Sequence, residues 1–534
     1  MAVTDHEAVF ATRGSEMFGS ARSFPQGMRT APSSLASRPD GGEVGTFVSG
    51  PGSLDERHGS SDVLVDARFD QRVRWSPGER LDHLFERKVD ELQHSGQSHR
   101  LAVDAGEGAL TYAELEERAN RLARHLTRCG VRSGDRVGLL SDHPLDGYTG
   151  MLATLKLNAT YVPLTPGFPV DRIAYICRDA GVSTVLTRSL HVETLDAVAA
   201  TVVVMDAEAT AIAAQPSHRL GPEERGLPVD ELAYAIYTSG MTGRPKGVAI
   251  EHASICNFVQ VAAEVYGITN EDRVYQGMTI AFDFSVEEIW VPWMAGATVV
   301  PKPQGAALIG QDLHDFLVDR RITGLCCVPT LLATLEDDLP DLRFLLVSGE
   351  PCPQDLITRW HRPDLRFVNA YGPPEATVTA TWTTLAPFRR VTIGKPLPTY
   401  SVVILEPGSC HVVARGGVGE ICIGGIGLAA GYLNRPDLTE KAFIDDSIAL
   451  PNNPSGKIYR TGDLGRIDAD GNIEYLGRID DRAAVRGFRI ELTEIESVQM
   501  LHTGIATAIV QTSHRQPPWM RPARSPRPPA LPSR

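Results

Sequence analysis

The most constraining feature of this chain is a short loop rich in glycine and hydroxyl side chains. Residues 237–248 read Tyr-Thr-Ser-Gly-Met-Thr-Gly-Arg-Pro-Lys-Gly-Val and directly follow the apolar run 232–236, which predicts a strand entering a tight turn. Glycines let backbone N–H groups approach an anion closely, hydroxyls add donors, and a lysine adds a point charge. The pattern therefore predicts a polyphosphate-binding loop, with the candidate residues Thr238, Ser239, Gly240, Thr242, Gly243 and Lys246.

Two other interpretations of the loop explain less. It is not a Walker loop, because no Gly-Lys-Ser/Thr follows at the required spacing. A structural glycine turn would explain the glycines, but not three hydroxyl groups together with Pro-Lys-Gly. An anion-binding role is the better explanation.

Length and composition narrow the class of protein. A chain of 534 residues is too long for one ordinary core and indicates two or more lobes. The net charge of −14 argues against a nucleic-acid-binding surface. No apolar run approaches the ~20 residues of a membrane helix, and the eight cysteines lack Cys-x-x-Cys spacing. We expect a cytoplasmic protein with reduced cysteines and neither nucleic-acid nor membrane partners.

Hydrophobic periodicity predicts an α/β chain. Residues 1–75 are rich in Gly, Ser, Pro and Arg and are expected to form a disordered leader. A capping-box pattern at 111–114 starts a helix that Gly130 ends. From about Val412 the pattern changes to short strands with Asp-Gly turns, which predicts a β-rich subdomain. Strand-like runs separated by helical stretches lie at 137–140, 184–186, 201–205, 297–300 and 344–347.

Several further motifs occur in a fixed order along residues 76–511. Together with the loop they resemble the adenylate-forming (AMP-binding) superfamily, in particular the amino-acid adenylation domains of nonribosomal peptide synthetases. This chain departs from the family pattern at Thr165, Met241, Pro374 and Ala484. The matching segments are 110–115, 161–163, 172–176, 282–285, 369–375, 419–432, 459–464, 477–480 and 490–496.

The resemblance implies a domain organisation. We expect a large multi-sheet adenylation lobe over 76–479, containing the β-rich subdomain, and a small α+β C-terminal lid that is truncated to 480–512. Residues 513–534 are Pro- and Arg-rich and are predicted to be a disordered tail. Relatives carry a lysine at the far end of the lid, whereas the last lysine here is Lys457. The isolated chain is therefore expected to be impaired in turnover.

The resemblance also assigns nucleotide-binding roles, with ATP and Mg²⁺ as cofactors. The loop residues named above would hold the β- and γ-phosphates, and Glu375 would be the Mg²⁺ ligand. Lys246, Glu375 and the hinge residue Asp480 are the expected catalytic residues. The remaining expected contacts are Asn369 and Tyr371 at the adenine, Asp463 at the ribose, Arg478 at ribose or phosphate, and Gly349 and Glu350 along the adenine cleft.

A substrate pocket follows in the same way. Asp283 would pair with the α-ammonium of an amino acid, although an aspartate at this position could also simply cap a helix. Glu287 suggests a basic substrate such as lysine or ornithine, because a carboxylate in an apolar pocket needs a partner. Alternatively, Glu287 or Glu288 could face water. The other expected lining residues are Phe284, Cys326, Leu346, Ser348, Ala370, Val378 and Thr379.

Three functions remain open at this point. The first is ATP-dependent activation of an amino acid for nonribosomal peptide synthesis, with a phosphopantetheine-bearing peptidyl-carrier domain as partner. The second is an acyl- or aryl-coenzyme A ligase of the same fold, which would not depend on Asp283. The third is a nucleotide-binding remnant with little turnover.

Overall fold

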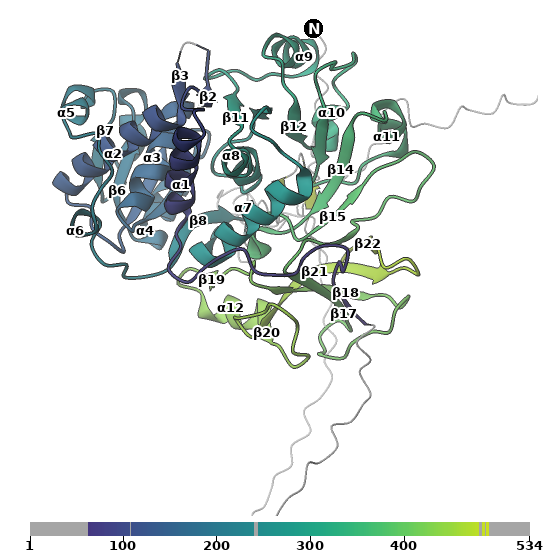
Figure 1. The fold of residues 1–534 in the computed structure, drawn as a ribbon. Helices are drawn as coiled ribbons and strands as arrows, with labels where there is room; N and C mark the ends of the chain where they lie inside the picture. The colour runs from purple at the N-terminus through teal and green to yellow at the C-terminus, as the bar shows by residue number, and fades with distance from the viewer. Residues whose placement is uncertain (1–61, 107, 240–243, 480–482, 486–487, 491–534) are drawn as a thin grey trace, which may run out of the picture.

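The computed structural model describes residues 62–106, 108–239, 244–479, 483–485 and 488–490 (Figure 1). Its described residues form a mixed α/β lobe with three large sheets and one small hairpin. The expected leader up to residue 61, the tail and most of the expected lid lie outside these ranges. The hairpin joins β23 (Ala483–Val485) to β24 (Phe488–Ile490) just after the expected hinge.

The first sheet has seven strands in the order β19-β9-β8-β5-β4-β6-β7. Its five strands from β8 to β7 are parallel neighbours, whereas β9 pairs antiparallel with both β8 and β19. Buried parallel strands need long apolar runs, and these strands are rich in Val, Leu and Tyr. The strands are β4 (Arg136–Leu140), β5 (Thr160–Leu164), β6 (Val182–Thr187), β7 (Thr201–Val204), β8 (Leu232–Thr238), β9 (Lys246–Glu251) and β19 (Gly431–Tyr432).

The helix that begins after Thr111 starts as the sequence predicts. The capping box is present: the Thr111 hydroxyl accepts from the Glu114 N–H, and the Glu114 carboxylate accepts from the Thr111 N–H. The helix that follows buries Leu115, Ala119 and Leu122 on one face. The helices of this part of the chain are α1 (Leu81–His94), α2 (Tyr112–Arg128), α3 (Pro144–Lys156), α4 (Val170–Ala180), α5 (Ala209–Ala213) and α6 (Pro222–Arg225), with the 3-10 helix η1 (Ser189–Leu195).

The second sheet has nine strands in the order β16-β15-β14-β13-β12-β10-β11-β2-β3. Its centre, from β14 to β2, is parallel, so the carboxyl ends of β12, β13 and β14 meet at one edge. The strands are β2 (Leu101–Asp104), β3 (Ala109–Thr111), β10 (Arg273–Gln276), β11 (Thr298–Pro301), β12 (Gly324–Cys327), β13 (Phe344–Val347), β14 (Arg366–Tyr371), β15 (Thr381–Thr384) and β16 (Lys395–Pro396).

The helices beside the second sheet carry candidate site residues. In Figure 1, α7 and α8 lie between the first two sheets, and large side chains of both, such as Phe258 and Trp290, belong to one continuous core cluster. The elements are α7 (His252–Tyr266), α8 (Phe284–Ala295), α9 (Gly310–Asp319), α10 (Pro329–Leu332), α11 (Gln354–Trp360) and the 3-10 helix η2 (Pro374–Ala376).

The third sheet is the predicted β-rich subdomain. It is antiparallel, in the order β1-β17-β18-β21-β20, with β22 also paired to β21. The described helices contain no segment long and apolar enough to cross a membrane. The elements are β1 (Val63–Leu64), β17 (Tyr400–Leu405), β18 (Gly419–Gly425), α12 (Pro436–Ala442), β20 (Phe443–Asp445), β21 (Lys457–Ile467) and β22 (Ile473–Arg478).

The start of the lobe differs from the sequence-based expectation at residue 76. Val63 and Leu64 form an edge strand paired with Val403 and Val402. The Arg74 N–H donates to the Asn257 side chain at 2.9 Å, which ties the following segment to α7. Residues 62–75 are therefore part of the lobe. A strand of two residues is too short to show a hydrophobic period. Its pairing partner also lies more than 300 residues away, so no local pattern in the sequence indicates it.

Candidate functional site

The predicted phosphate loop connects two antiparallel strands. Thr238 ends β8 and lies opposite Lys246, the first residue of β9, so the chain reverses direction between these two residues. Ser239 is buried, whereas Gly240, Thr242 and Gly243 lie outside the described residues. The Thr238 hydroxyl is buried and has no hydrogen-bond partner among the described residues. Because a buried hydroxyl normally finds a partner, this one is consistent with a missing ligand oxygen.

Lys246 lies against two buried groups from distant parts of the chain. Its Nζ donates to Glu375 Oε1 at 3.0 Å and to the Tyr432 hydroxyl at 2.8 Å. The Tyr432 hydroxyl in turn donates to Glu375 Oε1 at 2.6 Å, and the Lys246 Nζ lies 4.0 Å from the centre of the Tyr432 ring. Pairing between β19 and β9 places Tyr432 beside Val248. The lysine is thus held by an ion pair, a hydrogen bond and a cation–π contact.

The Glu375 carboxylate has the chemistry expected of a magnesium ligand. It is fully buried on η2, a short element that begins at Pro374 directly after Pro373. Mg²⁺ is a hard cation that takes one or two protein carboxylates and completes its shell with water and phosphate oxygens. A single carboxylate beside the phosphate loop fits this donor set. Pro374 offers no hydroxyl here, where the family pattern has a threonine.

The candidate adenosine contacts come from the second and third sheets. Tyr371 ends β14, and its hydroxyl donates to Asp463 on β21. Asp463 also lies opposite Arg478 on β22 and forms an ion pair with it. Asn369 is buried on β14, and its Nδ2 donates to the Thr392 carbonyl at 2.8 Å. Burial and the Asp463 charge raise the pKa of Tyr371, so this hydroxyl stays protonated and acts as a donor.

Gly349 and Glu350 follow β13 at the same edge of the second sheet. Gly349 has φ +80°, a conformation that favours glycine. Glu350 Oε2 accepts from the Thr330 N–H at 3.1 Å. This bond ties the segment after β13 to the start of α10. Asp480, the expected hinge, lies outside the described residues.

The expected substrate-pocket residues are brought together by α8 and the carboxyl ends of three parallel strands. Asp283 is buried directly before α8 and makes no side-chain capping hydrogen bond, so the helix-cap interpretation is not supported. Thr379 is buried on the segment after η2, whereas Ser348, just beyond β13, is half-buried. The apolar members all belong to one core cluster: Phe284, Cys326, Leu346, Ala370 and Val378.

Glu287 and Glu288 are both buried, at 1% and 0% exposure, so the interpretation that either faces water is wrong. The two point to different partners. Glu288 accepts from the backbone N–H of Met278 at 3.0 Å and from the Gln276 amide at 3.1 Å. Glu287 accepts from the Thr379 hydroxyl at 3.3 Å and from the Tyr266 hydroxyl. Glu287 is therefore the member of the pair that contacts Thr379, one of the expected pocket residues, whereas Glu288 lines a cavity together with Cys326.

Burial governs the ionisation of both carboxyl groups. It raises the pKa of Glu287 to about 8, with the Tyr266 and Thr379 hydroxyls acting in the opposite direction. It raises the pKa of Glu288 to about 7, opposed by its backbone hydrogen bonds. In the absence of a cationic partner, Glu287 is mostly a neutral acid at pH 7.

One strained segment links the two halves of the site. Thr377 and Val378 have φ values of +54° and +68°, and the second is unfavourable for a β-branched side chain. The segment 375–379 is only five residues long. It contains both Glu375, which pairs with Lys246, and Thr379, which donates to Glu287. Strain of this kind persists only where the surroundings fix it, and it is common at functional sites.

Two partners were not predicted as site residues. Tyr432 belongs to the matched segment 419–432 but carries no local signal of its contact with Lys246. Tyr266 lies on the buried face of α7, where an aromatic residue is indistinguishable from core. Both contacts depend on packing between distant elements.

The sequence profile of the AMP-binding enzyme family matches residues 91–433. The chain belongs to this family. The phosphinothricin tripeptide synthetase PhsC of Streptomyces viridochromogenes is 39% identical over 426 residues, which is 78% of this chain and 38% of that protein. The delta-poly-L-ornithine synthetase of Acinetobacter baumannii is 38% identical over 424 residues, 79% of this chain and 31% of that protein.

Solved structures agree with these relatives. The nonribosomal peptide synthetase FmoA3, in its alpha-methyl-L-serine-AMP-bound form, superposes with a TM-score of 0.67 at 31% identity, covering 76% of this chain and 46% of that one. This AMP-binding enzyme thus spans only a part of these longer proteins. The predictions of an adenylate-forming α/β fold and of an ATP-dependent, AMP-forming ligase are confirmed at the level of the family.

Proposed function

We propose that this AMP-binding enzyme activates an amino acid with ATP, forming an aminoacyl-adenylate and pyrophosphate for nonribosomal peptide synthesis. The observation that carries the proposal is the segment 375–379, which joins the Lys246–Glu375 pair to the Glu287 pocket within five residues. A carboxylate bound between them would lie next to the phosphates of a nucleotide on the loop.

The residues divide the reaction between them. A substrate carboxylate oxygen attacks the α-phosphorus, and the bond from that phosphorus to the bridging oxygen of pyrophosphate breaks. Lys246, Thr238 and Ser239 would stabilise phosphate charge. Tyr371, Asp463 and Arg478 would position the adenosine, together with Asn369, Gly349 and Glu350. Mg²⁺, when bound by Glu375, would neutralise further phosphate charge.

The pocket favours an amino acid with a basic side chain. Asp283 is a buried carboxylate that does not cap its helix, and it would pair with the α-ammonium group. Glu287 follows four residues later, about one helical turn along α8, and would pair with a side-chain cation. The similarity to a protein named delta-poly-L-ornithine synthetase supports an ornithine- or lysine-like substrate.

The relatives also suggest a partner. Because the similar proteins are nonribosomal peptide synthetases, we propose a peptidyl-carrier domain as the acceptor of the activated amino acid, and cytoplasm as the location. The expected loss of turnover in this chain alone stays a prediction.

A binding experiment tests the proposal without depending on turnover. Acyl-adenylate mimics with a sulfamoyl group in place of the phosphate should bind the full chain by calorimetry, with the ornithyl and lysyl mimics at least about tenfold tighter than the norleucyl mimic. Asp283→Asn should weaken all aminoacyl mimics and leave an aryl mimic unaffected. Equal or tighter binding of the aryl mimic would favour the coenzyme A ligase instead, and no binding by folded protein would exclude adenylation.

A further inference from the structure

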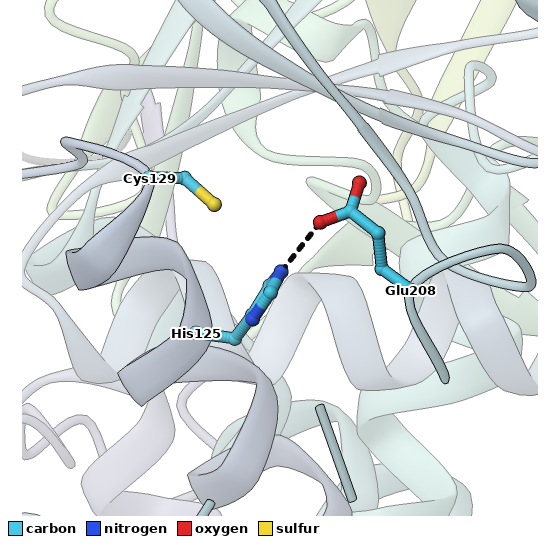
Figure 2. A group of neighbouring side chains, drawn as sticks. All are labelled: His125, Cys129 and Glu208. Atoms are coloured by element: carbon cyan, nitrogen blue, oxygen red, sulfur yellow. Dashed lines mark hydrogen bonds and ion pairs between the residues drawn. The ribbon is translucent and has the colours of Figure 1, made fainter. Parts of the chain in front are cut away.

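A second cluster of polar side chains lies away from the nucleotide site. His125 and Cys129 are one turn apart at the end of α2, and the Cys129 N–H donates to the His125 carbonyl at 3.0 Å. Glu208 faces them from the turn between β7 and α5. Figure 2 shows the thiol and the carboxylate, which come from these two elements, both directed toward the outer end of the imidazole ring. One ligand atom from each residue lies within 4.8 Å of the others.

The backbone holds the carboxylate in place. Glu208 Oε1 accepts from the Val204 N–H at 2.8 Å, and the Glu208 N–H donates to the Val204 carbonyl at 2.8 Å. The other oxygen, Oε2, therefore faces His125 Nε2 at 2.7 Å. The main chain thus fixes the carboxylate next to the imidazole with Oε2 directed at Nε2, so two of the candidate ligand atoms are already side by side.

We propose that His125, Cys129 and Glu208 form a zinc-binding site that joins the end of α2 to the start of α5. Sulfur, nitrogen and oxygen donors together suit Zn²⁺, whereas Mg²⁺ and Ca²⁺ prefer oxygen alone. Three protein ligands leave a fourth tetrahedral position for water. His125 is 8% exposed and the other two are half-buried, so an ion from solvent can reach the cluster.

Binding requires a small contraction of the cluster and the loss of one proton. Zinc–ligand bonds of about 2.0–2.3 Å place tetrahedral donor atoms roughly 3.3–3.8 Å apart. The two donor atoms that lie farthest apart must therefore approach each other by about an ångström, which a side-chain rotation can supply. The His125–Glu208 hydrogen bond must open so that the ion can lie between these two residues. Burial and the Glu208 charge raise the pKa of the Cys129 thiol, so zinc must displace its proton.

The position of the cluster separates it from the nucleotide site. Glu208 follows β7, which lies at the opposite edge of the seven-stranded sheet from β9 and β19, the strands that carry Lys246 and Tyr432. Zinc here would act on the stability of the α2–α5 corner and would not contact the reacting atoms. The sequence gives no spacing signal for this cluster, because Glu208 is distant from the His-x-x-x-Cys pair.

The test uses the untagged full chain after removal of metals with a chelator. Zn²⁺ should bind with a stoichiometry of one by calorimetry and should raise the unfolding temperature, whereas Mg²⁺ should do neither at the same concentration. Co²⁺ should give a thiolate charge-transfer band. Cys129→Ser should abolish that band and weaken zinc binding by at least about tenfold, because a lost ligand costs no less than a lost supporting group. Glu208→Gln keeps an oxygen for the Val204 N–H and should also weaken zinc binding.

Two control variants address binding elsewhere. Cys410→Ser removes an exposed cysteine. His191→Gln disrupts a His–Asp pair that belongs to no potential metal-binding group of the described residues. Both should bind zinc like the unmodified protein. Unchanged zinc affinity in folded Cys129→Ser, or loss of binding in Cys410→Ser instead, would overturn the proposal.

Discussion

Lys246 and Glu375 form a buried ion pair 3.0 Å long, although they lie 129 residues apart in the chain. Both side chains are almost completely shielded from water, at 6% and 0% exposure. The two charges that would bind phosphate and magnesium thus neutralise each other in the protein without ligand. A nucleotide with its metal would rearrange charges that are already desolvated, and this reduces the cost of assembling the site.

The effects of removing Lys246 and Glu375 on the free energy of unfolding should depend strongly on each other. Lys246→Met leaves the Glu375 carboxylate without its cation and should lower the free energy of unfolding by about 3–5 kcal/mol. Lys246→Met combined with Glu375→Met removes both charges and should recover most of that loss. Urea unfolding without nucleotide measures both effects.

A surface pair provides the control for this cycle. Lys457 and Asp445 lie 2.6 Å apart but are 46% and 91% exposed. Lys457→Met should change stability by no more than about 1 kcal/mol. A Lys246→Met effect as small as this would show that the buried pair is not formed.

Thr238→Val should separate stability from nucleotide binding. The Thr238 hydroxyl is buried without a partner in the described part of the chain, so an isosteric methyl group should leave the free energy of unfolding unchanged or slightly higher. If the hydroxyl donates to a phosphate, ATP affinity should fall by about tenfold or more. Thr187→Val is the matched control, because its hydroxyl donates to the Leu140 carbonyl at 2.9 Å. That variant should lose about 1 kcal/mol of stability and keep its ATP affinity.

Local signals predicted the elements of this fold better than the contacts between them. The capping box at Thr111 and Glu114 gave the start of α2, since every residue of that motif lies within one turn. Glu287 and Glu288 could not be distinguished, because adjacent helical residues point about 100° apart and α8 is apolar on most sides. The contact of Tyr432 with Lys246 required the register between β19 and β9, which no local pattern specifies.

The Asp463 carboxylate should distinguish nucleotides by their ribose hydroxyls. It lies between Tyr371 and Arg478, on strands whose pairing fixes its position. Asp463→Ala should weaken ATP binding by about 10–100-fold, as expected for lost hydrogen bonds to a charged group. The unmodified protein should prefer ATP to 2′-deoxy-ATP, and the variant should lose this preference.

A turn residue on the same hairpin is the control for Asp463. Asp468 accepts from the Asn472 N–H at 2.8 Å and stabilises the turn between β21 and β22. Asp468→Ala should lower stability and leave the nucleotide preference intact. If both variants lose ATP affinity equally while folded, Asp463 has no specific role at the ribose.

Binding of a basic amino acid should release a proton from Glu287. Burial holds the pKa of this group at about 8, above its ordinary value, so the empty pocket keeps it protonated at pH 7. A substrate cation favours the ionised form, and the bound complex should therefore expel close to one proton, with affinity rising from pH 6 to about pH 8. Calorimetry of the lysyl sulfamoyl mimic in buffers of different ionisation enthalpy measures this release.

Two controls identify the titrating group. The norleucyl mimic should release no proton at Glu287. Glu287→Gln can still accept from the Tyr266 and Thr379 hydroxyls and should abolish the difference between the two ligands. Proton release that persists in Glu287→Gln would place the titrating group elsewhere and remove the argument for a basic substrate.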